Sequence, residues 1–216
     1  MQTMGVLLPV FGIFIPALIL PGPDFVAVVR SSMTRGTRGG LLTTVGVSTC
    51  LGLYATLSLL GLSAVLVEYQ WLTWAVRVLG GAYLVWLGIR LLCARPAAPM
   101  GSNMPHGELP SNKVRGNALV FGFLVTLTNP KAIVLFASVF ATAVTASTPG
   151  WLMVLMIVLV VLSALAWYSV VSLFMSSAPV MRRFARARHW IERAAGASFV
   201  LIGGRILADA GKPVGA

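Results

Sequence analysis

The chain has 216 residues, of which 58% are hydrophobic and only 10% are charged. A soluble domain is about 25% charged, so this composition indicates an integral membrane protein. A spanning helix needs about 20 residues, and about six such helices use nearly the whole length, which excludes a separate soluble catalytic domain. The net charge of +11 is typical of basic residues gathered in cytoplasmic loops, so no nucleic-acid partner is expected.

Six apolar segments are predicted, and they indicate an all-α integral membrane protein with six transmembrane helices. They cover residues 4–29, 40–67, 71–92, 116–140, 151–175 and 194–208. Arginine and lysine gather in the first, third and fifth connections, whereas the second and fourth have none. Because basic loops stay inside, this alternation predicts a multi-pass membrane protein whose first, third and fifth connections are cytoplasmic and whose termini both lie outside.

The connection at residues 93–113 is rich in proline, glycine, serine and asparagine, which is typical of a flexible linker. It separates a first unit, residues 1–92, from a second unit, residues 114–216, each with three predicted spans. Because three is odd, the second unit enters the membrane from the opposite side. This layout predicts two inverted three-helix repeats, with broken first and fourth helices in corresponding places.

The first predicted span is interrupted by Pro21-Gly22-Pro23-Asp24. Both prolines lack an N–H group and Gly22 relaxes the backbone, so the helix breaks and restarts here. Asp24 then falls in the first turn of the new helix, where a carboxylate is stabilised. It either holds a kinked helix together or binds a cation or a proton, and the cost of burying a carboxylate favours binding.

The fourth predicted span is interrupted by Asn129-Pro130-Lys131. A residue before proline avoids the helical conformation, so Asn129 ends one helix and can cap the next with its side-chain oxygen. Lys131 lies about midway along its span, too deep to reach either surface easily. Two interpretations stay open for Lys131, a structural ion pair with Asp24 and the binding of an anionic group.

Small residues recur at every fourth position on both sides of the breaks. Such stripes allow close packing of helix backbones in lipid, and a pore-lining role for Thr44 or Ser48 is the alternative. The stripes comprise Gly36, Gly40, Thr44, Ser48, Gly52 and Thr56 in the first unit, and Ala118, Gly122 and Thr126 in the second.

An acid, a base and two free helix N-termini together complement a small zwitterion. An amino acid fits this site, with its ammonium at Asp24 and its carboxylate at Lys131, Asn129 and an exposed helix N-terminus. Burial also makes Asp24 a candidate proton carrier. The breaks at Pro21, Gly22, Pro23 and Pro130 would act as hinges. No motif for a metal, a cofactor or a catalytic nucleophile is present, so no enzyme is expected.

Two alternatives remain. A membrane conduit for thiol–disulfide exchange needs two nearby cysteines, and the chain has Cys50 and Cys93. An exporter or permease of another small solute is the second alternative, although Asp24 alone offers too few acidic ligands for a divalent cation. Elsewhere, Arg77 is expected to point outward or pair within the bundle. Arg205 and Asp209 are one turn apart and are expected to pair.

Three stretches carry a resemblance to a known family: PGPDF at 21–25, the arginine and glycine stretch at 35–40, and NPKA at 129–132. They resemble the LysE/RhtB family of bacterial amino-acid exporters nearly from end to end, and the threonine and homoserine branch most of all. The resemblance implies efflux of a small amino acid across the bacterial inner membrane by proton antiport, with both breaks at the centre of the transport path. In that membrane, the two outer termini would lie in the periplasm. It also implies oligomers, often homodimers.

Overall fold

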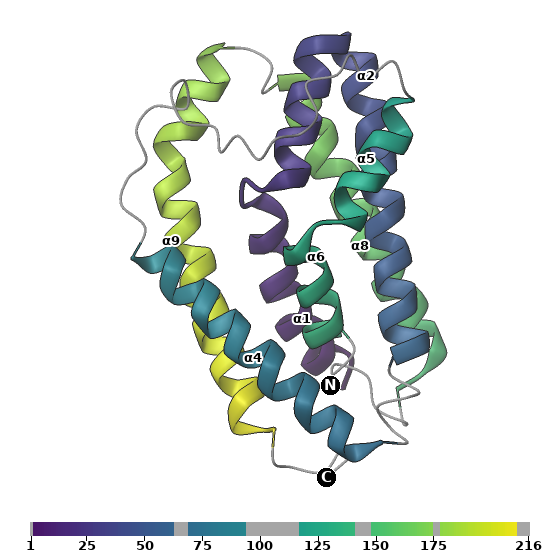
Figure 1. Ribbon diagram of the computed structural model, residues 1–216, viewed down its shortest axis with the longest axis vertical. Helices are drawn as coiled ribbons and strands as arrows, with labels where there is room; N and C mark the ends of the chain where they lie inside the picture. The colour runs from purple at the N-terminus through teal and green to yellow at the C-terminus, as the bar shows by residue number, and fades with distance from the viewer. Residues whose placement is uncertain (1, 63–68, 94–116, 141–147, 175–177, 211–216) are drawn as a thin grey trace.

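The computed structural model describes residues 2–62, 69–93, 117–140, 148–174 and 178–210. Every element within these ranges is a helix, which confirms the all-α prediction for this part of the chain (Figure 1). Apart from Cys93, the predicted linker at 93–113 lies outside the described residues. The helices are α1 (Gln2–Ile19), α2 (Pro23–Thr56), η1 (Leu57–Leu62), α4 (Gln70–Leu92), α5 (Ala118–Leu127), α6 (Pro130–Leu135), η2 (Phe136–Phe140), α8 (Gly150–Phe174) and α9 (Ala178–Ala208).

Several of these helices have the length and apolar character of membrane spans. Pro23–Leu60, Trp74–Leu92 and Gly150–Phe174 qualify singly, and Ala118–Leu127 with Pro130–Val139 qualifies as one span bent by 56°. The apolar part of α1, Val6–Ile19, is shorter. By length and composition the described helices thus give up to four spans, and the count of six stays a prediction.

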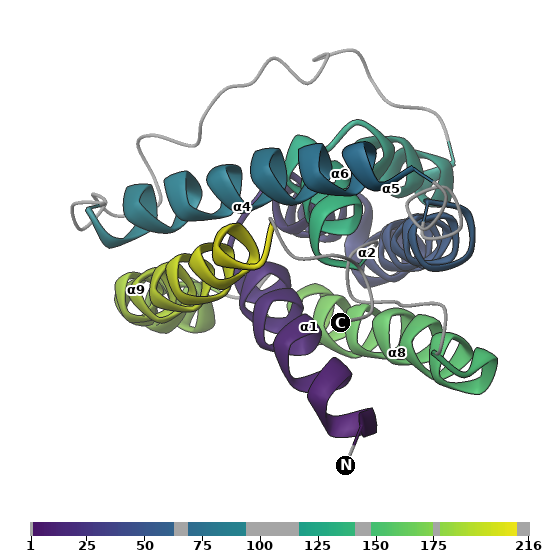
Figure 2. The same cartoon turned by 90° about the horizontal axis from the view of Figure 1, so that it is seen from below.

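Helix α1 lies in the middle of the bundle. Its residues Val10, Ile13, Phe14 and Ala17 are each at most 2% exposed. It contacts α8 and α9, and Figure 2 shows it between these two helices. A helix that is apolar on all sides suits a protein core or a membrane, which agrees with the buried positions of α1 and with Leu8, which is 69% exposed.

The chain reverses direction at Gly36, inside the stretch assigned as α2. Gly36 has φ 71° and ψ 178°, a region that is essentially restricted to glycine. The two halves of α2 lie side by side, as a hydrogen bond between them shows: the hydroxyl of Thr43 donates to that of Ser31 at 2.7 Å. The sequence predicted a connection between the apolar segment that ends at residue 29 and the one that begins at residue 40. This was wrong in extent, since the helix continues up to Gly36 and resumes directly after it.

Glycines bring helices into backbone contact at two interfaces. A Cβ atom on Gly122 of α5 would clash with the backbone of Thr43 on α2. Between α4 and α9, a Cβ on Gly88 would lie 2.7 Å from the Gly196 oxygen, and one on Gly196 would lie 2.8 Å from the Gly88 oxygen. These contacts confirm close packing as the role of Gly122 in the predicted stripe.

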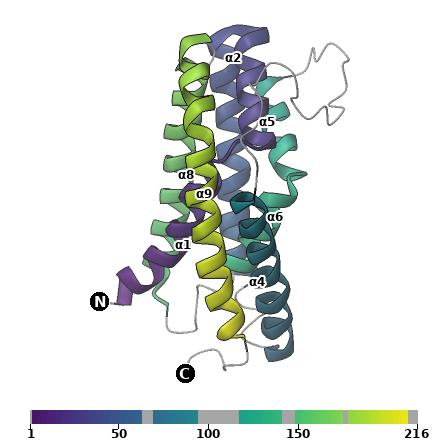
Figure 3. The same cartoon turned by 90° about the vertical axis from the view of Figure 1, so that its left-hand side faces the viewer.

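The two ends of the bundle differ in composition. The reversal of α2, the end of α8 and the start of α9 lie at one end, and the starts of α4 and α8 lie at the other (Figures 1 and 3). Exposed aromatic side chains occur at the starts of α4 and α8, namely Tyr69, Trp71, Trp74 and Trp151. Arg30, Arg35 and Arg38 flank the reversal of α2.

Candidate functional site

The first predicted break is present, because α1 ends at Ile19 and α2 begins at Pro23. Gly22 caps α2 in an extended conformation, with no side-chain cap. Pro21 has no N–H, so the carbonyl of Ala17, four residues earlier, has no helical donor. Asp24 occupies the first turn of α2 and is only 3% exposed. The break therefore leaves a free carbonyl on one side and a buried carboxylate on the other.

The second predicted break is also present, because α5 ends at Leu127 and α6 begins at Pro130. Asn129 caps α6 as expected, since its side-chain oxygen accepts from the backbone N–H of Lys131 at 3.1 Å. The two helices begin alike, with a cap residue, a proline and then an ionisable residue. Both breaks lie near the middle of the bundle (Figure 1).

The carboxylate of Asp24 is bonded by two donors from the other break. The hydroxyl of Thr126 donates to Oδ1 at 3.1 Å, and the amide nitrogen of Asn129 donates to Oδ2 at 3.0 Å. Thr126 and Asn129 are as deeply buried as Asp24. Two neutral hydrogen bonds thus replace water around this carboxylate, which is the condition for burying it.

The ammonium of Lys131 is bonded in the opposite direction, to the end of α1. It donates to the carbonyl of Ala17 at 2.8 Å and to that of Leu20 at 3.4 Å. Ala17 is the residue whose carbonyl Pro21 left without a helical donor. Lys131 therefore caps α1 and places a positive charge at its negative dipole end. Gly22 makes room for this, because a Cβ there would lie 3.1 Å from Nζ.

The sequence left open a direct ion pair between Asp24 and Lys131. Within the described residues, the hydrogen bonds of Lys131 Nζ go to the two carbonyls and those of the Asp24 carboxylate come from Thr126 and Asn129. The two charges still attract each other through space. The structure therefore brings the predicted acid, amide and base together without joining the acid to the base.

Two residues of the site were missed by sequence reasoning. Thr126 was assigned to a packing stripe, although it lies in the last turn of the helix that ends at the second break. Tyr54 was not singled out. Its hydroxyl donates to the carbonyl of Leu127 at 2.7 Å, which is free because the N–H of Lys131 bonds to Asn129. Tyr54 therefore stabilises the end of α5 as Lys131 stabilises the end of α1.

The cysteines give no support to a thiol conduit. Cys50 is buried in α2 and Cys93 is exposed at the end of α4, and both are free thiols. No group of three or more histidine, cysteine, aspartate or glutamate residues that could hold a metal ion occurs in the described ranges. The polar chemistry at the breaks therefore rests on one carboxylate, one amide, one ammonium and the neighbouring hydroxyls.

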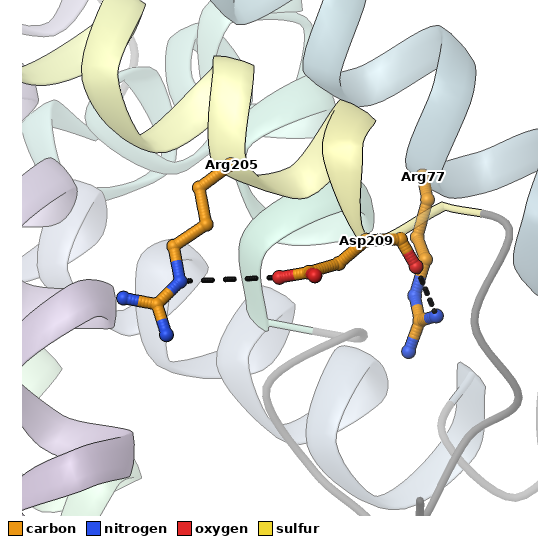
Figure 4. A network of polar contacts seen from close by, with 3 residues as sticks. All are labelled: Arg77, Arg205 and Asp209. Atoms are coloured by element: carbon orange, nitrogen blue, oxygen red, sulfur yellow. Dashed lines mark hydrogen bonds and ion pairs between the residues drawn. The ribbon is translucent and has the colours of Figure 1, made fainter.

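A separate polar network lies at the end of α9 (Figure 4). Arg205 and Asp209 form the predicted ion pair, with 3.9 Å between Nε and Oδ2. Arg77 pairs within the bundle, donating from Nη1 to the backbone carbonyl of Asp209 at 3.2 Å. Because the ion pair is exposed, it contributes little to stability. The network ties α4 to the end of α9, away from the two breaks.

Comparisons with known proteins agree with this arrangement. A family described as "LysE type translocator" matches residues 15–210, which include both breaks. A threonine efflux protein of Salmonella typhi is 32% identical over 192 residues, covering 88% of this chain and 92% of that protein. The threonine efflux protein of Escherichia coli K12 is 31% identical over 195 residues, with the same coverage of both chains.

A homoserine/homoserine lactone efflux protein of Salmonella typhi is 32% identical over 124 residues, which are 56% of this chain and 55% of that protein. No solved structure matches the chain. A translocator moves a solute without converting it, so the expectation of a membrane transporter rather than an enzyme is confirmed by the family. The match extends over both breaks and nearly all described helices, and the chain belongs to the LysE type translocator family.

Proposed function

We propose that this protein exports small neutral amino acids, with threonine or homoserine favoured, from the cytoplasm across the bacterial inner membrane by proton antiport. One observation carries the proposal: a buried carboxylate and a lysine ammonium face the same pair of helix breaks without pairing. The names of the threonine and homoserine efflux relatives support the substrate class.

The unpaired charges suit a zwitterion. Asp24 is held by two neutral donors, and Lys131 is held by two neutral acceptors. A substrate ammonium at Asp24 and a substrate carboxylate at Lys131 would exchange these for charge-assisted hydrogen bonds, which are stronger. The first turn of α6, capped by Asn129, would add its positive dipole end to the carboxylate site.

The same carboxylate accounts for antiport. Asp24 can hold either a proton or the substrate ammonium, and binding of one weakens binding of the other. If the substrate-free carrier reorients only when Asp24 is protonated, one amino acid leaves the cell for each proton that enters. Thr126 and Asn129 would keep the carboxylate in place between the two steps.

The two breaks are also the proposed hinges of alternating access. Both α2 and α6 begin with a proline after a cap residue, and the side chains of each break bond to the other. These features support two inverted three-helix units, residues 1–92 and 114–216, which rock about Pro21, Gly22, Pro23 and Pro130. We also propose that the protein forms a homodimer, because the family resemblance implies oligomers of this kind.

The orientation follows from the ends of the bundle. The reversal of α2, with its arginines, would face the cytoplasm. The exposed aromatic residues at the starts of α4 and α8 would lie at the periplasmic interface. Since α1 begins and α9 ends at that second end (Figure 3), both termini would be periplasmic.

Export from cells preloaded with threonine-containing dipeptides tests the function. Wild type should export threonine, and Asp24→Asn and Lys131→Met should each be at least about tenfold slower, which is the effect of about 1.4 kcal/mol. Asp209→Asn is the matched control, because Asp209 is half-exposed and belongs to the network at the end of α9. If both site variants export as fast as wild type at equal membrane abundance, the charged site is wrong. If wild type exports no amino acid tested, the substrate class is wrong.

A further inference from the structure

The orientation of the Asn129 side chain determines what one oxygen of Asp24 can do. The Asn129 oxygen accepts from the backbone N–H of Lys131, so its amide nitrogen must be the atom that faces Asp24 Oδ2. An amide nitrogen donates hydrogen bonds and does not accept them. Oδ2 must therefore remain an acceptor, and a proton placed on it would point at another hydrogen.

The oxygen on the other side of the carboxylate has a different kind of partner. The hydroxyl oxygen of Thr126 lies 3.1 Å from Asp24 Oδ1 and 3.1 Å from the backbone carbonyl of Gly122. A hydroxyl has one hydrogen to donate and two lone pairs that accept. Thr126 can therefore donate to either Asp24 or Gly122, and while it donates to Gly122 it can accept from Asp24.

We propose that Thr126 is the positioning residue for the coupling proton, and that it directs this proton to Oδ1 of Asp24. When Asp24 is ionised, Thr126 donates its hydrogen to Oδ1. When a proton from water binds Oδ1, the new O–H donates to Thr126, whose own hydrogen turns to the carbonyl of Gly122. Thr126 loses no proton, and the net change is one proton gained by Asp24. The inference rests on the proton antiport proposed above.

Burial makes this exchange of roles important. Thr126 has no measurable exposure and Asp24 is 3% exposed, so bulk water does not replace a missing partner. An unmade hydrogen bond at a buried group costs far more than a made one contributes. A partner that can only donate would leave the O–H of the protonated acid without an acceptor. A partner that can only accept would leave the ionised carboxylate without a donor. Thr126 satisfies both states without movement of its heavy atoms.

The other ionisable groups that interact electrostatically with Asp24 are Lys131 on α6, Cys50 and Tyr54 on α2, and Tyr168 on α8. Helices α1 and α5 contain no ionisable residue. The ammonium of Lys131 bonds to carbonyls of α1, and the hydroxyl of Tyr54 bonds to that of Leu127. Of the atoms bonded to the Asp24 carboxylate in the described structure, the Thr126 hydroxyl oxygen alone can both donate and accept.

Purified protein in liposomes separates the proton step from the substrate step. Exchange of labelled threonine across the membrane at equal concentrations uses the loaded carrier, whereas transport driven by a pH gradient also needs the protonated return. Thr126→Val should lower gradient-driven transport at least about tenfold more than it lowers exchange, since tenfold matches the loss of about one hydrogen bond. A purely structural role would lower both rates alike.

Two further variants complete the test. Thr126→Ser keeps the hydroxyl and should restore gradient-driven transport. Thr49→Val removes an exposed threonine whose hydroxyl makes the same bond to the carbonyl four residues earlier, at 2.8 Å from Val45, and it should change neither rate. If Thr126→Val keeps the wild-type ratio of gradient-driven transport to threonine exchange, the inference about Thr126 is wrong, and the proposed function is not affected. The same holds if a folded Thr126→Ser protein lacks coupling.

Infrared difference spectra of the wild type keep the inference testable if Thr126→Val does not fold. Acidification should produce a carboxyl band at the position of a hydrogen-bonded O–H. This band should be absent from Asp24→Asn. A band at the position of a free O–H would overturn the inference. Wild-type protein that exchanges no threonine, or that is insensitive to a pH gradient, would overturn the proposed function and the inference together.

Discussion

At the scale of single residues, each of the two breaks is stabilised by hydrogen bonds from side chains of the other. Pro21 removes the helical donor of the Ala17 carbonyl, and Lys131 supplies a new one. The Asn129 side chain uses its oxygen to cap α6 and its nitrogen to bind Asp24. Each interruption is therefore stabilised by a side chain from the other interruption, which explains how a chain in lipid tolerates both.

Gly22 offers a test of the position of Lys131. Its backbone is extended, with φ −139°, so alanine fits there without strain, but the new Cβ would lie 3.1 Å from the Lys131 nitrogen. We expect Gly22→Ala to displace the ammonium and weaken the bond to Ala17, worth about 1 kcal/mol. Export should fall about fivefold, and the melting temperature should fall by about 2–4 °C at most.

Gly204→Ala is the control for Gly22→Ala, because a Cβ at Gly204 meets nothing within 4 Å. Export rates from preloaded cells and thermal melting of the purified proteins give both quantities. Wild-type export by Gly22→Ala would show that the position of the ammonium does not matter for transport.

Part of the site was predictable from sequence and part was not. Asp24, Asn129 and Lys131 stand out because each adjoins a proline in an apolar segment, and burial of such groups is costly. Thr126 does not stand out, since a threonine in a helix usually bonds to its own backbone. Its contact with Asp24 joins residues 102 positions apart, and no local pattern determines such a contact.

At the scale of elements, the reversal in α2 depends on one glycine. A loop was expected because residues 30–39 separate two apolar segments, but hydropathy and charge predict the membrane boundary and side and not the backbone path. Gly36 alone adopts a positive φ among the described residues. The helix can therefore continue on both sides of it, and the hydroxyl bonds of Ser31 and Thr43 join the two halves.

Gly36→Ala should be destabilising for backbone reasons only. At φ 71° and ψ 178° a side chain costs about 1–3 kcal/mol, and a Cβ there would meet nothing within 4 Å. We expect a lower melting temperature in detergent, whereas Gly150→Ala, at an open position of α8, should melt like wild type. Equal melting of the two variants would mean that Gly36 does not need its positive φ.

The contact between α4 and α9 is a second element-scale test. A Cβ on Gly196 would lie 2.8 Å from the Gly88 oxygen and 3.0 Å from a Leu92 side-chain carbon. Overpacking of this kind costs about 1–3 kcal/mol, so Gly196→Ala should lower the melting temperature. Gly204→Ala on the same helix is the matched control. A stable Gly196→Ala protein would contradict the close backbone approach of the two helices.

At the scale of the whole molecule, composition predicted the membrane class, and the helices agree with it. The number of spans is harder to read from helix lengths, because a span that is broken in the middle appears as two helices, each shorter than a full span. The apolar part of α1, Val6–Ile19, and helix α5, Ala118–Leu127, are each too short to cross a bilayer alone. The proposed spans therefore consist of helix pairs at each break.

Labelling of single cysteines tests the proposed orientation. The background carries Cys50→Ser and Cys93→Ser. Single cysteines are then introduced by Thr34→Cys, beside the α2 reversal, and by Gly150→Cys, at the start of α8, and both positions are exposed. We expect a membrane-impermeant maleimide to label Gly150→Cys in spheroplasts and Thr34→Cys only in inverted vesicles. Labelling of both cysteines from the same side would contradict the assignment of the two ends.

The central claim is that the two breaks form one site for a zwitterion, and binding to the purified protein tests it most directly. Three ligands separate the contacts: threonine, 3-hydroxybutyrate, which lacks the ammonium, and 1-amino-2-propanol, which lacks the carboxylate. Wild type should prefer threonine to either analogue at least about tenfold, because each analogue leaves one buried group unpaired.

Asp24→Asn should lose the preference over 3-hydroxybutyrate and keep that over 1-amino-2-propanol, and Lys131→Met should do the reverse. This crossed pattern follows only if Asp24 holds the ammonium and Lys131 holds the carboxylate of one bound molecule. Two variants that keep both preferences, or that lose both alike, would contradict the account.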